Sequence, residues 1–527
     1  MLVPPAHPMR PTDRVSRIIA HYLPKGRQDA LMTSLAILAG DVTDEVEQLL
    51  KGLDPSWADY AVASVYAALM EKKRRKKLGA YFTPPGLVEY LLKRAVDLGI
   101  DLATQRVRDP AAGGAAFIVP IAREMVKRWR AQGLGDTAIV GRLKRQLMGR
   151  EIDEGLATLA NALLTRCLTQ EYEFAPSAVA SMTLISRGDT LAIAKDEGAD
   201  HEIGNPPFLR LAARDEPSDF ERFDDIASGR LNLYAVFVRR GVEALQAKGL
   251  LAYIIPASFI GGPEFRKFRK RIRQLAEVLA VDMINGRSTV FTNVVQDTCV
   301  LILRKRSRQL VDLKATSASS RSVSGDGSIV ATGKIKLPAD DGAWILPGTK
   351  VDLPSKLSEW GYAPRIGYLV ANRQKARIHQ RRAKGRVPLI WAKAIGQDGT
   401  FDFAKGAKLR KHGWVDVPED APYVARQACV AIQRTSSRNQ KKRLTAAAIP
   451  SEFVSEHGGV VAENHVILLL PTRPDAASPS DLAAALNRSD VGEQMDRMCG
   501  SASIPAKLLA NLPMPLPPAG RPKDPSG

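Results

Sequence analysis

The sequence has few cysteines and no long apolar run. No stretch reaches the roughly 18 apolar residues that a membrane-spanning helix requires, and the N-terminal MLVPPAHPMRPTDR lacks the apolar core of a secretory signal. The four cysteines, which are Cys167, Cys299, Cys429 and Cys499, stand far apart and form no C-x-x-C pair. This distribution argues against a disulfide framework or a zinc site and predicts a protein of the reducing cytoplasm.

Positive charge, by contrast, is abundant. The 527 residues include 76 Lys and Arg against 56 Asp and Glu, which gives a net charge of +20. Most of the excess lies in residues 351–450, which hold 20 Lys and Arg but 7 Asp and Glu. A solvated surface explains a modest imbalance, but clustering of this kind favours a polyanionic partner. We therefore expect a nucleic-acid partner and a nucleoid-associated location.

The pattern of apolar residues predicts several domains. Residues 1–78 show helical spacing, whereas residues 79–310 alternate short apolar strands with amphipathic helices. This alternation predicts an α/β fold, with a largely parallel sheet that binds ligands at the carboxyl ends of its strands. The Ser/Gly-rich stretch in 311–339 predicts a linker or exposed loop. Residues 340–515 predict a separate, mixed, β-rich domain, and residues 516–527 a disordered tail.

Within residues 79–310, small or acidic side chains stand where strands are predicted to end. In RDPAAGGAAF, Gly113 and Gly114 let backbone N–H groups approach a ligand, although helix entries and tight packing use the same residues. Glu151 ends the strand of LMGREID, where an acid suits hydrogen bonds to ribose hydroxyls. Asp189, in SRGDTLAI, is placed to accept from an exocyclic amine. Each acid alone is more often a plain surface carboxylate, but together they predict an adenosine pocket.

The stretch GNPPF places Asn205, Pro206, Pro207 and Phe208 after another strand. Proline has no backbone N–H and fixes its own φ, so this segment is stiff and extended. A sheet or helix cannot absorb all of this segment's carbonyl acceptors, Asn205 adds an amide oxygen, and Phe208 adds a flat apolar face. The segment is therefore predicted to bind a planar group that carries an amine.

The ordered set GAYFTPPGLVEYL, DPAAGGAAF, GREID, GDTLAI and GNPPF resembles the gamma-class N6-adenine DNA methyltransferases of restriction–modification systems. The resemblance covers residues 75–305 in detail, and GNPPF is highly specific in this company. It implies a Rossmann-like sheet, S-adenosyl-L-methionine as the cofactor, and methyl transfer to an adenine flipped out of double-stranded DNA. It requires no metal and no membrane, and it implies a separately encoded cognate restriction endonuclease as a further partner.

The same resemblance implies roles for single positions. The cofactor-binding residues would be Thr83, Asp109, Ala111, Gly113, Glu151 and Asp189. Catalysis would depend on Asn205, Pro206, Pro207 and Phe208, with the ring of Phe208 stacked on the target base. Phe291 stands where the family often has a second ring beside that base.

The glycine loop departs from the family's common Asp-Pro-Ala-Cys-Gly-Ser-Gly-Ala-Phe. Ala112, Gly114 and Ala115 replace the Cys, the Ser and the last Gly. Ala115 adds a methyl group near the cofactor and disfavours a positive φ. Because the loop still consists of small residues, we expect cofactor binding to persist, with an impaired affinity as the alternative.

Residues 340–515 are the predicted target-recognition domain. The runs at 373–386 and 433–443 mix Lys and Arg, which neutralise phosphates, with side chains that can read base edges. Either run could instead be an ordinary solvated face. DNA contact is predicted for Arg434, Arg438, Lys441 and Lys442. The run IPAKLLANLPMPLPP also resembles the closing segment of target-recognition domains in this family.

Four other functions compete with DNA adenine methylation. A fused methylase and restriction endonuclease would need a cleavage domain, for which the 78 residues before GAYFTP are short. An RNA or protein-glutamine N-methyltransferase would also use an Asn-Pro-Pro-aromatic motif but would usually lack a long basic C-terminal region. A cytosine-N4 enzyme would typically carry Ser in place of Asn205. A non-catalytic DNA-binding protein would have no need of the intact motif and both strand-end acids.

Overall fold

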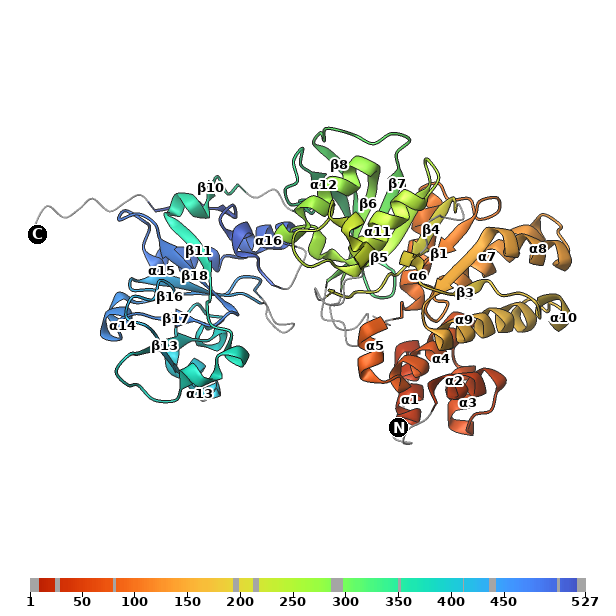
Figure 1. Ribbon diagram of the computed structural model, residues 1–527, viewed down its shortest axis with the longest axis horizontal. Coiled ribbons are helices and arrows are strands. Elements are labelled where there is room, and N and C mark those ends of the chain that lie inside the picture. The colour runs from red at the N-terminus through yellow and green to blue at the C-terminus, as the bar shows by residue number, and fades with distance from the viewer. Residues whose placement is uncertain are drawn as a thin grey trace, which may run out of the picture. The chain divides into compact units, whose positions relative to one another are not determined.

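The computed structural model describes residues 9–23, 29–78, 82–192, 199–211, 218–285, 297–348, 352–410, 412–435, 442–499 and 503–518. The chain forms two compact units, whose elements are drawn in Figure 1. Unit 1 comprises Met1–Ala257 and Glu264–Asp341, and unit 2 comprises Ser258–Pro263 and Gly342–Gly527. None of the described helices is long and apolar enough to cross a membrane.

Unit 1 begins with a group of helices. They are α1 (Pro11–Tyr22), α2 (Ala30–Ala39), α3 (Asp44–Lys51), α4 (Pro55–Leu69) and the basic α5 (Lys72–Leu78). Asp29 and Asp54 cap α2 and α4 by accepting hydrogen bonds from two backbone N–H groups each. The buried faces of these helices, including Val15 and Ile18, share one apolar core with the sheet that follows. The N-terminal helices are therefore an integral part of unit 1.

A mixed sheet with the strand order β3-β2-β1-β4-β5-β7-β6-β8-β9 forms the centre of unit 1. The strands are β1 (Val107–Asp109), β2 (Leu147–Glu151), β3 (Ile185–Arg187), β4 (His201–Gly204), β5 (Leu250–Pro256), β6 (Ala276–Ile284), β7 (Thr298–Lys305), β8 (Thr316–Val323) and β9 (Ile329–Leu337). The strands from β3 to β5 in this order pair in parallel, and β7 runs antiparallel to both neighbours. Every residue of β5 is buried, as expected for a strand covered on both faces.

Helices connect these strands. They are α6 (Pro85–Asp97), α7 (Ile118–Ala131), α8 (Asp136–Gln146), α9 (Glu154–Arg166), α10 (Pro176–Val179), α11 (Leu233–Ala244) and α12 (Arg266–Leu275). The chain order of the strands reverses between β1 and β4, which lie side by side. In open α/β sheets, ligands bind beyond the carboxyl ends of the strands at such a switch point. Asp109 ends β1 and Asn205 directly follows β4, so both belong to this edge.

Unit 2 is mixed and rich in strands. Its described sheets have the orders β11-β18-β15-β16 and β12-β14-β13-β17, with a separate β10–β19 pair. The strands are β10 (Ser355–Lys356), β11 (Tyr362–Ile366), β12 (Ile378–His379), β13 (Arg386–Ile390), β14 (Trp414–Asp416), β15 (Cys429–Gln433), β16 (Ala446–Ile449), β17 (Val461–Ala462), β18 (Val466–Pro471) and β19 (Pro513–Met514). The helices are α13 (Phe403–Arg410), α14 (Ser451–Glu456), α15 (Pro479–Leu486), α16 (Ser489–Met498) and α17 (Ala506–Leu509).

The prediction of a linker over residues 311–339 is wrong. Most of this stretch forms β8 and β9, which pair antiparallel and extend the sheet of unit 1. A serine-rich sequence is tolerated in β8 because residues elsewhere in the fold form hydrogen bonds with its hydroxyl groups. Ser320, which is buried, donates to the Val281 carbonyl at 2.7 Å. Of the predicted tail 516–527, residues 519–527 lie outside the described part of the chain.

Polar side chains and a close backbone approach join the β8–β9 hairpin to α6. The buried Asp282 of β6 accepts from Tyr90 Oη at 2.8 Å and Arg94 Nε at 3.1 Å, both on α6. Arg94 also donates to Ser319 Oγ of β8 at 2.6 Å. At the hairpin tip, a Cβ on Gly86 would lie 2.2 Å from the Asp326 carbonyl oxygen. The start of α6 is thereby fitted against the hairpin tip with no room for a side chain.

We expect Gly86→Ala to lower the free energy of unfolding by about 1–3 kcal/mol, because the new methyl group forces backbone apart in a packed region. Gly141→Ala is the matched control. In α8 the added methyl meets only the end of the Arg145 side chain, at 3.4 Å. Because alanine favours helix, this control should gain about 0.5–1 kcal/mol. Urea unfolding of both variants measures the difference, and equal stabilities would show that the hairpin tip yields without cost.

Candidate active site

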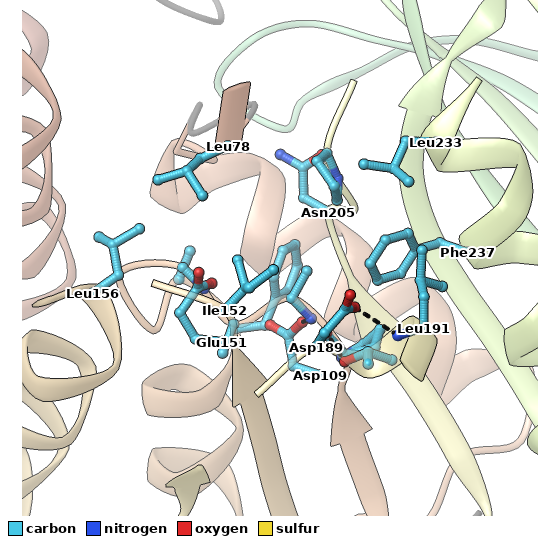
Figure 2. A pocket seen from close by; sticks show the side chains of 18 of the residues that line it. Leu78, Asp109, Glu151, Ile152, Leu156, Asp189, Leu191, Asn205, Leu233 and Phe237 are labelled. Carbon is cyan, nitrogen blue, oxygen red and sulfur yellow. Dashed lines mark hydrogen bonds between the residues drawn. The ribbon is translucent and has the colours of Figure 1, made fainter. Parts of the chain in front are cut away.

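A cavity of about 250 Å³ opens at the carboxyl ends of β1, β2 and β4 in unit 1 (Figure 2). Six predicted cofactor residues line it, together with two of the predicted catalytic residues. They are Thr83, Asp109, Ala111, Gly113, Glu151, Asp189, Asn205 and Pro207. Residues far apart in the sequence are brought together because each follows the end of a strand or precedes a helix at one edge of the sheet.

The small-residue loop between β1 and α7 forms one wall. Asp109 Oδ1 accepts from Ala111 N at 3.1 Å, and Ala112 N donates to the Arg150 carbonyl of the next strand at 2.9 Å. Gly113 has a φ of +52°, where glycine is at ease. Ala115 has a φ of +60°, which our sequence analysis expected alanine to disfavour. The loop retains its tight turn at a cost of roughly 1–2 kcal/mol, the usual penalty of left-handed backbone for a residue with a Cβ.

Glu151 is held by backbone N–H groups at both of its oxygens. Oε2 accepts from Gly113 N at 2.9 Å, and Oε1 accepts from Asp153 N at 2.9 Å. These bonds fix the carboxylate at the junction of the loop and the start of α9. Burial raises the pKa of Glu151 above its usual range.

The N-terminal helices reach this carboxylate through Asp153. The buried Asp153 accepts from Tyr66 Oη of α4 at 3.0 Å and from Arg74 Nε of α5 at 3.0 Å. It also caps α9 by accepting from Leu156 N at 3.0 Å. Asp153 therefore has its side chain fixed by two helices while its own N–H orients Glu151. Sequence analysis missed this role because Tyr66 and Arg74 lie 87 and 79 residues away.

Asp189 stands two residues beyond β3 and lines the cavity next to the β1–α7 loop, where Thr190 Oγ1 donates to the Pro110 carbonyl at 2.5 Å. Its Oδ1 accepts from Leu191 N at 2.8 Å, the dashed line of Figure 2. Its side chain is exposed to the cavity mouth. Leu191, which is buried, adds an apolar surface beside the acid.

Asn205 is oriented by a residue from a distant segment. Its Nδ2 donates to Thr83 Oγ1 at 3.1 Å, and Thr83, which precedes α6, is buried. Because the nitrogen of the amide is directed toward Thr83, the amide oxygen lies on the opposite edge of the group. Gly204, just before it, has no room for a side chain, since a Cβ there would lie 2.7 Å from Asp109 Oδ1. The two motifs of the switch point are thus in direct contact.

The other residues of the motif differ in burial and in their contact with the cavity. Pro206 is buried, and Pro207 lines the cavity. Phe208 is half-buried and packs against the core of unit 1, away from the lining of this cavity. Phe291, Arg438 and Lys441 lie outside the described residues. Arg434 and Lys442 belong to unit 2, where Lys442 is exposed and Arg434 Nη1 donates to the Asn464 carbonyl at 3.1 Å.

Apolar residues that sequence analysis missed complete the cavity. Ile152, which directly follows Glu151, is 54% exposed although it is a large aliphatic side chain. Leu233 and Phe237 face the cavity from α11 (Figure 2). Their spacing of four residues on one helix was the available signal, but the same spacing is typical of core packing. The cavity thus combines carboxylates at strand ends with flat or branched apolar walls, which suits a nucleoside.

A buried polar cluster lies behind the cavity. Burial raises the pKa of Asp109 to about 8, and the nearby carboxylates of Glu151 and Glu202 act in the same direction. Glu202 of β4 accepts from Arg108 Nε of β1 at 2.9 Å and from Tyr253 Oη of β5. In the described part of the chain, no group of three or more His, Cys, Asp and Glu side chains is arranged to hold a metal ion.

Comparisons with known proteins show what this part of the chain is similar to. Residues 145–291 match the family described as Eco57I restriction-modification methylase. This region contains Glu151, Asp189 and Asn205. The match spans 147 of the 527 residues, so the similarity to this family covers that part of the chain.

Individual relatives are Type II methyltransferases. The chain is 24% identical over 405 residues to M.BsuBI of Bacillus subtilis, covering 73% of this chain and 76% of that protein. It is 24% identical over 261 residues to M.PstI of Providencia stuartii, covering 46% of this chain and 50% of that protein. The match to M.PstI therefore spans half the length of that relative.

A solved structure shares the fold. The chain aligns with the Type IIL restriction-modification enzyme MmeI, solved in complex with DNA, with a TM-score of 0.55 at 14% identity. The alignment covers 89% of this chain and 73% of that chain. The predicted fold class, an α/β sheet with a β-rich C-terminal region, is confirmed.

We expect Ala115→Gly to be at least about 1 kcal/mol less destabilising than Ala112→Gly, because only position 115 gains from relief of a left-handed conformation. Both side chains are buried, so the loss of a methyl contact is similar. Urea unfolding measures both variants. Equal losses would mean that Ala115 is unstrained.

We expect Asp109 to make the protein less stable as the pH rises from about 4 to about 8, by up to about 1.4 kcal/mol per pH unit. The folded state keeps this proton up to about pH 8, whereas the unfolded chain loses it near pH 4. The folded state therefore binds more protons in this window, and raising the pH favours unfolding. Asp109→Asn should lack this component when unfolding free energies are compared from pH 5 to pH 8. Parallel profiles for the two proteins would contradict the raised pKa.

Proposed function

We propose that the protein is a site-specific DNA adenine-N6 methyltransferase that uses S-adenosyl-L-methionine and protects DNA in a restriction–modification system. The observation that carries the proposal is the Asn205 amide, oriented by Thr83 beside a cavity lined by Glu151 and Asp189. The similarity to Type II methyltransferases and to the Eco57I methylase family supports it.

The lining residues fit the proposed cofactor. Glu151 ends β2 with a fixed carboxylate, suited to the two hydroxyls of a ribose. Asp189 offers an acceptor for an adenine amine, with Leu191 and Ile152 as apolar surfaces for the ring. S-adenosyl-L-methionine, when bound, supplies an electrophilic methyl group.

Asn205 and Pro206 would act on the target base. Their two carbonyl oxygens would accept the hydrogens of the adenine amine and hold its nitrogen pyramidal. Because Thr83 and the neighbouring prolines hold this segment rigid, little reorganisation is needed at the moment of transfer. Phe208 would stack on the flipped base after moving from its half-buried position in the structure.

Unit 2 would select the DNA sequence. Its basic residues include Arg434, Arg438, Lys441 and Lys442, which would contact the DNA backbone. A separately encoded endonuclease would be the cognate partner. Sequencing of methylated bases in DNA from cells that express the chain would identify both the modified base and its context, and modified cytosine or unmodified DNA would refute the proposal.

We expect Asn205→Ala to lower methyl transfer to duplex DNA by about 100-fold or more, since removal of one preorganised polar group at a reacting centre costs about that much. Binding of the cofactor should persist, because Glu151 and Asp189 are untouched. Phe208→Ala should reduce transfer less, because stacking contributes only about 1–3 kcal/mol per base.

Transfer of a labelled methyl group and calorimetric binding of the cofactor measure the two effects separately. A folded Asn205→Ala protein that no longer binds the cofactor would contradict this division of roles. So would a loss of transfer in Phe208→Ala that equals or exceeds that of Asn205→Ala.

A further inference from the structure

Unit 2 presents a pair of stacked tyrosines at its surface. The rings of Tyr368 and Tyr423 are parallel to within 6°, with centroids 3.9 Å apart. Tyr423 is half-buried, whereas Tyr368 is 48% exposed. A large ring that is held in a stack and still half open to solvent is a rigid surface available to a partner.

The backbone that carries Tyr368 is also fixed. Gly367 N donates to the Val466 carbonyl at 2.8 Å, and Asn464 N donates to the Leu369 carbonyl at 2.8 Å. A Cβ on Gly367 would lie 2.0 Å from the Glu463 carbonyl oxygen, so only glycine allows this close approach. Tyr368 is therefore preorganised on both sides, and ordering its ring on binding would cost little conformational entropy.

Two arginines frame the pair. Arg377 Nη2 donates to Tyr423 Oη at 2.6 Å and to the Asp416 carbonyl at 2.9 Å. Arg365 Nη1 donates to the Pro422 carbonyl, next to Tyr423, at 2.8 Å. These hydrogen bonds go to neutral oxygens, so they position the guanidinium groups without cancelling their charge.

The sequence around Tyr368 is basic, whereas the segment that leads to Tyr423 contains Glu419 and Asp420. Residues 360–397 contain nine Lys and Arg and no Asp or Glu. Arg373 and Lys375, which follow the Tyr368 loop, are both exposed. Such a surface is complementary to a polyanion.

Arg434, in the basic run at 433–443, contacts the turn that also holds the Tyr368 segment. Arg434 N donates to the His465 carbonyl at 2.8 Å, and Arg434 Nη1 donates to the Asn464 carbonyl at 3.1 Å. The turn at 463–466 is the same one that fixes Tyr368. The fold thus brings Arg434 to the turn that fixes Tyr368, although 66 residues separate the two in the sequence.

We propose that Tyr368, backed by Tyr423 and framed by Arg365 and Arg377, contacts base edges of duplex DNA, while Arg373 and Lys375 contact the flanking phosphates. We call this set the tyrosine platform. This proposal rests on the proposed function, which supplies DNA as the partner and the sequence to be tested. The residues of the platform all belong to unit 2. Phosphate contacts give affinity without sequence information, and contacts to base edges give specificity. Tyr368 is an uncharged, rigid aromatic side chain among cations, and we therefore assign it a role in specificity.

The test measures binding of the full chain to a fluorescent duplex that carries the methylated sequence found by sequencing, and to a scrambled duplex. We expect Tyr368→Ala to weaken binding to the cognate duplex by about tenfold, in the range of one lost base contact, with the salt dependence unchanged. Tyr368→Phe, which keeps the ring, should stay within about twofold of the wild type. Leu516→Ala, at another exposed apolar residue of unit 2, is the matched control and should bind like the wild type.

The charged members give a different signature. Replacing both Arg373 and Lys375 by glutamine should weaken binding to both duplexes alike and reduce the slope of log affinity against log salt by about 2. If Tyr368→Ala binds the cognate duplex as the wild type does, or weakens both duplexes equally, the platform does not read bases. Unchanged thermal unfolding and cofactor binding exclude misfolding as the cause.

Failure of this inference and failure of the proposed function give different results. A wild-type chain that methylates DNA while Tyr368→Ala loses no discrimination refutes the platform alone. A wild-type chain that methylates no DNA refutes the proposed function. Binding to single-stranded DNA or to a protein in preference to any duplex would overturn the choice of partner.

Discussion

The pairing of β1 with β4 is the constraint from which the site follows, and a buried ion pair fixes its register. Arg108 lies directly opposite Glu202 in this pairing, and Arg108 Nε donates to Glu202 Oε1 at 2.9 Å in the core. A shift of the pairing by one residue would turn the two charged side chains away from each other and leave them unpaired in an apolar environment. Because Asp109 follows Arg108 and Asn205 follows β4, this register places the two key side chains together. Such a pair contributes specificity of structure more than net stability.

Orientation of Asn205 then depends on elements far from the switch point. Thr83 receives the amide N–H of Asn205, and Thr83 leads into α6. The start of α6 is held in turn by the β8–β9 hairpin, whose tip meets Gly86. A single hydrogen bond of this kind contributes only about 0.5–1.5 kcal/mol to stability. This hydrogen bond matters more for the orientation of the Asn205 amide than for stability, since a preorganised acceptor needs no reorganisation when charge develops.

Sequence analysis predicted which side chains lie together where local sequence determines position, while their roles stay predictions. Asp109, Glu151, Asp189 and Asn205 each end or follow a short apolar strand, and parallel strands bring such ends to one edge. Sequence analysis failed for β8, because its serines are typical of a linker and nothing nearby in the sequence indicates that Ser320 donates to the Val281 carbonyl of another strand. The failure has a physical cause, because a hydrogen bond that distant residues supply leaves no trace in the local pattern of amino acids.

The link from Asp153 to the N-terminal helices makes those helices part of the cavity wall. Asp153 sits two residues after Glu151, and its carboxylate is bound by Tyr66 and Arg74 while its N–H holds Glu151. Gly155 permits this approach, since a Cβ there would lie 2.2 Å from Tyr66 Oη. The basic helix α5 therefore shares an ion pair with Asp153, the residue that orients Glu151. Arg74 and Glu151 are thus joined through Asp153 by two hydrogen bonds, so the position of the Glu151 carboxylate depends on a helix that precedes the sheet in the sequence.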